Sequence, residues 1–233
     1  MQKLFTPLLG ITALMLLLSL VLVFGYAPPE KTMGIVYKIF YFHVPNAIAM
    51  GVLFVMCSVC CLIYLVSPSR RMDALAATAA ELAVMTGIIV LITGPLWARK
   101  AWGHWWNIYD ARLNITLVSV FIFIGYFALR AFVGDREKGK LISAGLGVLG
   151  APAFYFIKIA VEKWGGNHPK NVVYGKGEGL IDPKMRTTFL VSLVSILLLV
   201  VVLFWVRYNY RRVQDRFDEL AVELDELGLL GEG

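Results

Sequence analysis

The sequence has little charge, and its few cysteines lie close together. Charged residues make up 16% of the 233 residues, whereas 59% are hydrophobic. A soluble domain needs a largely polar surface, so this composition excludes an ordinary soluble fold. The three cysteines, Cys57, Cys60 and Cys61, fall in one apolar run, which excludes a framework of disulfides between loops. We interpret them as small buried apolar side chains, rather than as a redox or metal-binding pair.

The sequence also lacks any basic stretch interleaved with aromatics, although its net charge is +6. We therefore expect no nucleic-acid partner. Lys and Arg residues in the loops of a membrane protein set its topology instead. No internal repeat, low-complexity tract or soluble domain is visible.

Six apolar runs have about the 20 residues that a helix needs to cross a bilayer core of roughly 30 Å. They are Leu8–Tyr26, Val44–Val66, Ala76–Leu96, Leu113–Phe132, Leu141–Val161 and Thr187–Val206. We predict an all-α membrane protein with six transmembrane helices, because a helix satisfies its backbone groups internally. The first run exceeds the apolar core of a signal peptide, about 7–15 residues, which predicts a retained helix.

Six spans place both termini on one side of the membrane. Lys and Arg divide evenly between the two sides, but they are densest in the short loops 67–75 and 133–140 and in the tail that begins at Arg207. Dense basic residues in short loops favour the cytoplasmic side. We therefore expect a multi-pass protein of the cytoplasmic (inner) membrane, with cytoplasmic termini and with loops 27–43, 97–112 and 162–186 outside.

The sequence divides at about residue 206. Residues 1–206 are predicted to form the transmembrane domain, and residues 207–233 a cytoplasmic amphipathic tail. Apolar residues recur in the tail at alternating spacings of four and three, namely at Val213, Phe217, Leu220, Leu224 and Leu227. The pattern favours a short amphipathic helix that rests on the protein or on lipid headgroups, with contact to a partner helix as the alternative.

The predicted outer loops gather the histidines and most tryptophans. All three histidines, His43, His104 and His168, lie in or beside these loops, as do five of the six tryptophans. An interfacial aromatic belt would populate both faces, whereas residues 97–112 contain four Trp and a Tyr. Flat aromatic rings can cover a large planar apolar ligand. The basic residues Arg99, Lys100 and Arg112 could pair with its carboxylates or simply anchor the loop at the interface.

Three further residues of these loops have two interpretations each. Asp110 comes just before a predicted helix, where Asp caps backbone N–H groups. His43 closes the stretch 33–42, which we predict to be a short interfacial helix, and His168 lies in a turn-rich stretch. Loop histidines are usually just solvated, but a pair of neutral imidazoles can also ligate a haem iron.

A recognisable pattern emerges from this loop. The segment Trp102-Gly103-x-Trp105-Trp106, followed by Asp110-Ala111-Arg112-Leu113, resembles the tryptophan-rich "WWD" signature of haem-handling membrane proteins. Its place between the third and fourth of six helices is similar to the CcmC family of cytochrome c maturation proteins. The resemblance covers the chain from the first helix to the sixth. It implies a transiently bound b-type haem at the outer membrane face, with His43 and His168 as axial ligands.

The resemblance also implies contacts and partners. The residues implied to contact haem are Arg99, Trp102, Gly103, Trp105, Trp106, Tyr109, Asp110 and Arg112. It implies delivery of haem to the haem chaperone CcmE, beside the ATP-driven pair CcmA/CcmB and the small subunit CcmD. No nucleophile or acid–base pair stands out, so we expect no classical enzyme.

The loop departs from the family pattern in one respect. Residues 107–109 make it one residue longer than usual, with Tyr109 in place of Trp. His104 is an unusual residue at the variable position of the motif, which makes it a third candidate contact for haem.

Three alternative functions stay open: a CcsA/ResC-type cytochrome c synthase, a b-type electron-transfer subunit and a small-molecule transporter. The transporter would use ionisable residues and broken helices at mid-membrane, for which Glu81, Lys158 and Pro152 are the candidates.

Overall fold

A computed structural model describes residues 2–133, 136–169, 180 and 182–227 of the protein. The described part contains helices and no named strand, and six helical segments are long and apolar enough to cross a membrane. The prediction of an all-α protein with six transmembrane helices is therefore confirmed. The predicted loop 162–186 and the end of the tail lie partly outside the described residues.

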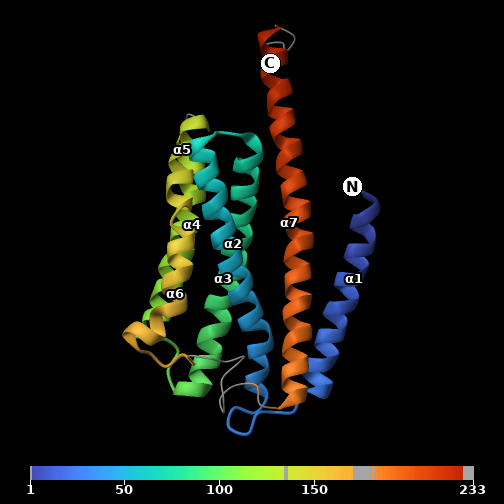
Figure 1. Ribbon diagram of the computed structural model, residues 1–233, viewed down its shortest axis with the longest axis vertical. Coiled ribbons are helices and arrows are strands. Elements are labelled where there is room, and N and C mark those ends of the chain that lie inside the picture. The colour runs from blue at the N-terminus through green and yellow to red at the C-terminus, as the bar shows by residue number, and fades with distance from the viewer. Residues whose placement is uncertain (1, 134–135, 170–179, 181, 228–233) are drawn as a thin grey trace.

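The helices follow the predicted order. They are α1 (Gln2–Val21), extended by the π-helical turn η1 (Leu22–Tyr26), the 3-10 turn η2 (Ile35–Ile39), α2 (Phe40–Val66), α3 (Arg70–Trp102), α4 (Ala111–Phe132), α5 (Arg136–Gly147), α6 (Gly150–Trp164) and α7 (Pro183–Glu226). In Figure 1, α1 lies beside α7 on one side of the bundle, and α4, α5 and α6 lie on the other side of α2 and α3.

The central pair α2 and α3 forms the core of the bundle. Small residues on α3 let the two backbones approach closely, as is typical of helix packing in membranes. The buried ones are Ala74, Ala76, Ala77, Ala79, Ala80 and Ala83. Cys57, Cys60 and Cys61 are free and buried in this core. The interpretation of the cysteines as buried apolar side chains is confirmed.

The fifth span is broken where the sequence suggested. Pro152 has no N–H, so it leaves the carbonyl of Val148, four residues earlier, without its helical donor. The hydroxyl of Ser58 on α2 donates to that carbonyl at 2.6 Å. A Cβ on Gly150 would come within 2.5 Å of the Phe54 carbonyl oxygen. The break between α5 and α6 is thus stabilised by close contact with α2.

Two carboxylates on α3 are paired with arginines of other helices. Arg130 of α4 donates to both carboxylate oxygens of Asp73 on α3, at 2.5 and 2.8 Å. Glu81 of α3 pairs with Arg207 and Arg211 of α7 at 2.7 and 2.6 Å. Such pairing satisfies ions in an apolar environment, so Glu81 holds two helices together rather than standing alone at mid-membrane.

Three expectations about element boundaries were wrong. The stretch 33–42 is not a separate interfacial helix, because the 3-10 turn η2 runs directly into α2 at Phe40 and places His43 inside α2. The tail is not a separate short helix either, because α7 is continuous to Glu226. Helix α3 continues to Trp102, so the loop spans only 103–110. Apolar runs mark the membrane-facing length, whereas a helix continues through polar residues until a helix-ending residue such as Gly103.

The three predicted outer segments meet at one end of the bundle. The α1–α2 connection, the α3–α4 loop and residues 165–169 after α6 lie together at the lower end in Figure 1, opposite the turn between α2 and α3. The C-terminal part of α7 extends past that turn at the other end. The predicted apolar seam of α7 is exposed at each of its positions, Val213, Phe217, Leu220, Leu224 and Leu227.

Candidate functional site

Asp110 is the centre of the polar contacts at this end. Its side chain is completely buried and joins three segments. Oδ1 accepts hydrogen bonds from the backbone N–H groups of Arg112 and Leu113 at 3.1 and 3.3 Å, which caps α4. Oδ2 accepts from the N–H of Asn167 at 2.9 Å and from Nδ1 of His168 at 3.2 Å. The predicted capping role is confirmed, and the same carboxylate also orients a candidate ligand.

The charge of Asp110 is favoured by these donors. Burial opposes ionisation, but the hydrogen bond and charge of His168 and the N–H groups of Asn167 and Leu113 outweigh it and lower the pKa of Asp110 to about 2. The carboxylate is therefore ionised at neutral pH. Gly166 makes room for it, since its φ is +131° and a Cβ there would lie 2.7 Å from Asp110 Oδ2.

The Asp110 contact selects one form of His168. A carboxylate only accepts, so the facing Nδ1 of His168 carries a proton. In the neutral ring, Nε2 then keeps its lone pair and can bind a metal. Metal-ligating histidines are commonly oriented in this way by a carboxylate on the other nitrogen.

His43 is oriented in the same way by a hydroxyl. Its Nδ1 lies 2.9 Å from Oγ1 of Thr93 on α3. The single hydroxyl proton of Thr93 is donated to the carbonyl of Ile89 at 2.6 Å, so Thr93 accepts from His43 Nδ1–H. The Nε2 lone pair of His43 is again available. Gly94 allows this approach, because a Cβ there would lie 3.2 Å from the imidazole Cε1.

Two tryptophans at the end of α3 pack together beside His168. Trp97 lies one turn after Thr93 on α3, and its ring packs edge-on against Trp102, with centroids 5.4 Å apart. Trp102 in turn packs against His168, with centroids 5.1 Å apart. The indole Nε1 of Trp97 is buried and has no hydrogen-bond partner among the described residues.

His104 differs from the other two histidines. Its Nε2 lies 3.1 Å from the Asn167 side-chain nitrogen, which donates to it. The ring proton of neutral His104 is therefore on Nδ1, and that atom is buried without a partner in the described part of the chain. With its lone pair occupied by Asn167, His104 is a hydrogen-bond donor toward the site rather than an iron ligand.

The residues before Asp110 form a tight turn. Asn107 accepts from the N–H of Tyr109 at 2.9 Å through its side chain and from the N–H of Asp110 at 3.0 Å through its carbonyl. Asn114 of α4 accepts from the indole of Trp106 at 3.3 Å and donates to the Ile108 carbonyl at 2.7 Å. This turn leads directly into Asp110, which caps α4.

The loop also presents an exposed aromatic surface. Trp105 is 56% exposed and Tyr109 84% exposed. Trp102 and Trp106 are partly buried. This arrangement can cover one face of a flat ligand outside the helical core.

The two basic candidates are engaged by main-chain carbonyls. Arg112 donates to the carbonyls of Ile157, Lys158 and Pro169, each at 3.2 Å. Arg99 donates to the carbonyl of Gly103, the residue that ends α3 with a φ of +81°. Both arginines therefore stabilise the folded loop, and binding of ligand carboxylates by them stays a prediction. The third basic candidate, Lys100, is exposed, as is Arg99.

Sequence reasoning missed the residues that orient the ligands. Thr93, Asn114, Gly166 and Asn167 belong to the site by contact, although none stood out from the sequence. Gly166 and Asn167 precede His168 directly, so their turn-forming character was a signal for a loop but not for the Asp110 contact.

Comparison with known proteins identifies the family of this chain. A model of the CcmC family, described as heme exporter protein C, matches residues 1–223. The chain is 33% identical over 177 residues to the heme exporter protein C of Escherichia coli K12, covering 76% of this chain and 70% of that protein. It is 33% identical over 178 residues to the Bradyrhizobium diazoefficiens protein of that name, with 76% and 67% covered. It is 26% identical over 212 residues to that of Haemophilus influenzae, with 90% and 85% covered. The protein therefore belongs to the heme exporter protein C family.

Proposed function

We propose that this protein binds haem at the outer face of the cytoplasmic membrane and hands it to the haem chaperone CcmE for c-type cytochrome biogenesis. The observation that supports this most is the matched state of His43 and His168. Each donates its Nδ1 proton to a fixed acceptor and keeps Nε2 for an axial iron bond. Haem is the cargo here, and the chain supplies its ligands without a covalent bond.

The remaining residues have complementary roles. Trp102, Trp105 and Trp106 cover the macrocycle, with Gly103 and Tyr109 at the edge of the loop. The unpartnered N–H groups of Trp97 and His104 suit a ligand with carboxylates, because buried donors are normally satisfied. The haem propionates would bind to these N–H groups and to Lys100. Arg99 and Arg112 would join them by giving up their hydrogen bonds to main-chain carbonyls. Asp110 acts through His168 rather than on haem directly.

The partners follow from the same role. We propose that CcmA/CcmB and CcmD assemble with this chain and that both termini are cytoplasmic, so that the aromatic loop faces the periplasm. A b-type electron-transfer subunit is less well supported, because His168 lies in a loop beside an exposed aromatic surface. A release site suits exposure better than a permanent redox centre does.

Haem hand-over tests this proposal. Purified protein loaded with haem is mixed with purified CcmE, and covalent haem on CcmE is followed by gel staining for haem. We expect transfer from the unaltered protein and from Thr86→Val, whose hydroxyl donates to the Leu82 carbonyl of its own helix, at similar extents, but none from His43→Ala/His168→Ala. Equal transfer from the double variant would overturn the proposal.

A further inference from the structure

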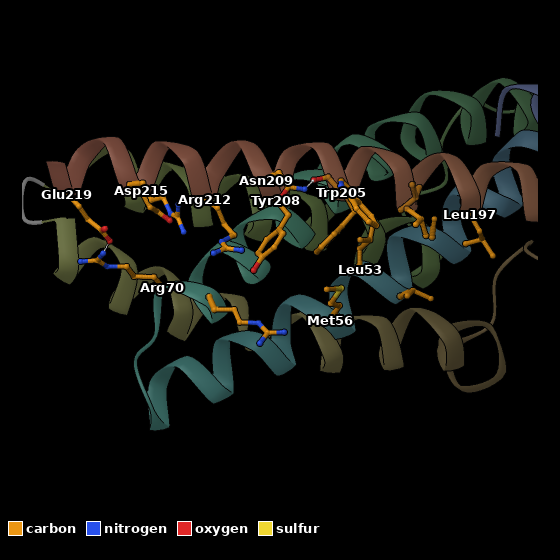
Figure 2. A pocket seen from close by; sticks show the side chains of 17 residues that line it. Leu53, Met56, Arg70, Leu197, Trp205, Tyr208, Asn209, Arg212, Asp215 and Glu219 are labelled. Carbon is orange, nitrogen blue, oxygen red and sulfur yellow. Dashed lines mark hydrogen bonds and ion pairs between the residues drawn. The ribbon is translucent and has the colours of Figure 1, made fainter. Parts of the chain in front are cut away.

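A cavity runs from the middle of the bundle to the end opposite the aromatic loop. It has a volume of about 1020 Å³ and is formed between α7, the middle of α2 and the start of α3. Figure 2 shows the side chains of Trp205, Tyr208 and Arg212 on α7 facing Leu53 and Met56 of α2 across it. Val52 and Val201 line it and are 56% and 50% exposed, so the cavity is a groove open at the side of the bundle.

The lining of this groove changes in character along α7. From Leu197 to Phe204 the lining residues of α7 are apolar, and Ala49, Val52, Leu53 and Met56 of α2 face them. Trp205 and Tyr208 follow, the aromatic types enriched at membrane interfaces. Beyond them the lining is charged. The groove therefore has an apolar part, an aromatic level and a charged end. They follow the order of acyl chains, interface and headgroups in one lipid leaflet.

The charged end carries an excess of positive charge. Four arginines and two carboxylates line it, an excess of two positive charges: Arg70, Arg71, Arg212, Arg216, Asp215 and Glu219. Arg70 pairs with Glu219 across the end of the groove. The guanidinium of Arg212 stacks over the Tyr208 ring at 6.0 Å, a geometry that leaves the edge N–H groups able to donate.

Contacts outside the groove fix α7 against its neighbours. Glu81 of α3 binds Arg207 and Arg211 of α7, on the neighbouring face of that helix. On the far side, Ser192 of α7 and Ser19 of α1 share a buried hydrogen bond at 2.8 Å. The groove is therefore a fixed feature of the packed helices.

The dimensions favour one lipid molecule. The apolar lining from Leu197 to Trp205 covers about 12 Å of helix at 1.5 Å per residue, close to the roughly 15 Å thickness of one leaflet's hydrocarbon. Basic clusters between transmembrane helices at the interface recognise anionic lipid headgroups. A partner helix would need the apolar part but not a cluster of arginines at one end.

We propose that this groove binds one anionic phospholipid, with an acyl chain between Val52 of α2 and Val201 of α7 and the phosphate among Arg71, Arg212 and Arg216. The site is separate from the haem site and does not depend on the proposed function. A bound lipid would fill the space between α7 and the central helix pair and tie the charged part of α7 to the membrane surface.

Lipid titration followed by native mass spectrometry tests the proposal. The purified protein is titrated with phosphatidylglycerol or phosphatidylcholine of identical acyl chains. We expect one phosphatidylglycerol to be retained about tenfold more tightly than phosphatidylcholine. Both lipids carry a phosphate, but in phosphatidylcholine the choline cation offsets its charge and is repelled by the arginines. Arg71→Gln/Arg216→Gln should abolish this preference. The control Lys31→Gln/Lys163→Gln removes two exposed charges elsewhere and should retain it.

Two further variants identify the occupant. Val201→Trp fills the apolar part without changing charge, and it should lose the retained phosphatidylglycerol while melting at an unchanged temperature. A photo-crosslinking residue at position 201, activated in native membranes, should add the mass of a phospholipid. A polypeptide adduct, equal retention of both lipids, or an unchanged preference in Arg71→Gln/Arg216→Gln would each overturn the proposal.

Discussion

Asp110 Oδ2 and His168 Nδ1 lie 3.2 Å apart, while the other oxygen of the same carboxylate caps α4. One buried side chain thus links the end of the aromatic loop to the segment that carries a candidate iron ligand. The cap of α4 and the contact with His168 use different carboxylate oxygens. A substitution of Asp110 can therefore weaken one of these two contacts and keep part of the other.

Asp110→Asn should therefore affect stability and haem binding together. The neutral amide still accepts at one position, but it no longer fixes His168 in the required form. We expect the free energy of unfolding to fall by about 1–3 kcal/mol and haem retention to fall at least tenfold. Thermal melting and the visible spectrum of the purified protein measure the two effects.

Asp182→Asn provides the matched control. Asp182 caps α7 through Lys184 and Met185 in the same manner, with N···O distances of 2.7 and 3.4 Å. This variant should keep most of its cap, since Asn also caps helices well, and it should keep its haem spectrum. If both variants bind haem equally well, the link between Asp110 and the ligand is wrong.

The pH dependence of stability should report the charge of Asp110. Its pKa is lowered from 3.8 to about 2 in the folded protein, so its contribution is fully present above about pH 4 and is lost as the pH falls toward 2. The stability difference between the unaltered protein and Asp110→Asn should be constant above pH 5 and shrink by about 2 kcal/mol between pH 4 and 2. Unfolding in detergent across this range measures it. A difference that grows on acidification would contradict the assignment.

Thr93→Val should weaken the haem site with little change in packing. Valine has nearly the shape of threonine but cannot accept the Nδ1 proton of His43, so the ring is no longer fixed. Loss of such an orienting contact typically lowers metal affinity about 10–100-fold. Thr86→Val is the control, since Thr86 on the same helix donates to the Leu82 carbonyl and contacts no histidine. Haem titration of both variants by visible absorbance should separate them.

Gly166→Ala should disrupt the site more than Gly165→Ala does. Both glycines have positive φ, +131° and +74°, but only a Cβ at 166 would meet the Asp110 carboxylate. Backbone strain of about 1–3 kcal/mol is expected in each variant. Only Gly166→Ala should also displace Asp110 and therefore lose haem. Melting temperature and haem content should show this difference. Equal haem content in the two variants would mean that the carboxylate tolerates the shift.

The sequence predicted the helices well because bilayer thickness constrains their length. The break at Pro152 and the burial of Cys57 also followed from local chemistry. The ends of α3 and α7 did not, since hydropathy falls at Leu96 and Val206 although nothing there ends a helix. Asp110 was predicted as a cap, but its contact with His168 depends on two segments 58 residues apart. Thr93 could not be predicted, because a threonine that orients a histidine looks in sequence like any other helical threonine.

The visible and electron paramagnetic resonance spectra of the haem-loaded protein test the central claim most directly. Two imidazole ligands should give a low-spin ferric haem signature, and His43→Ala and His168→Ala should each remove it while His104→Ala keeps it. A low-spin bis-imidazole signature that survives in the His43→Ala/His168→Ala double variant would contradict the account.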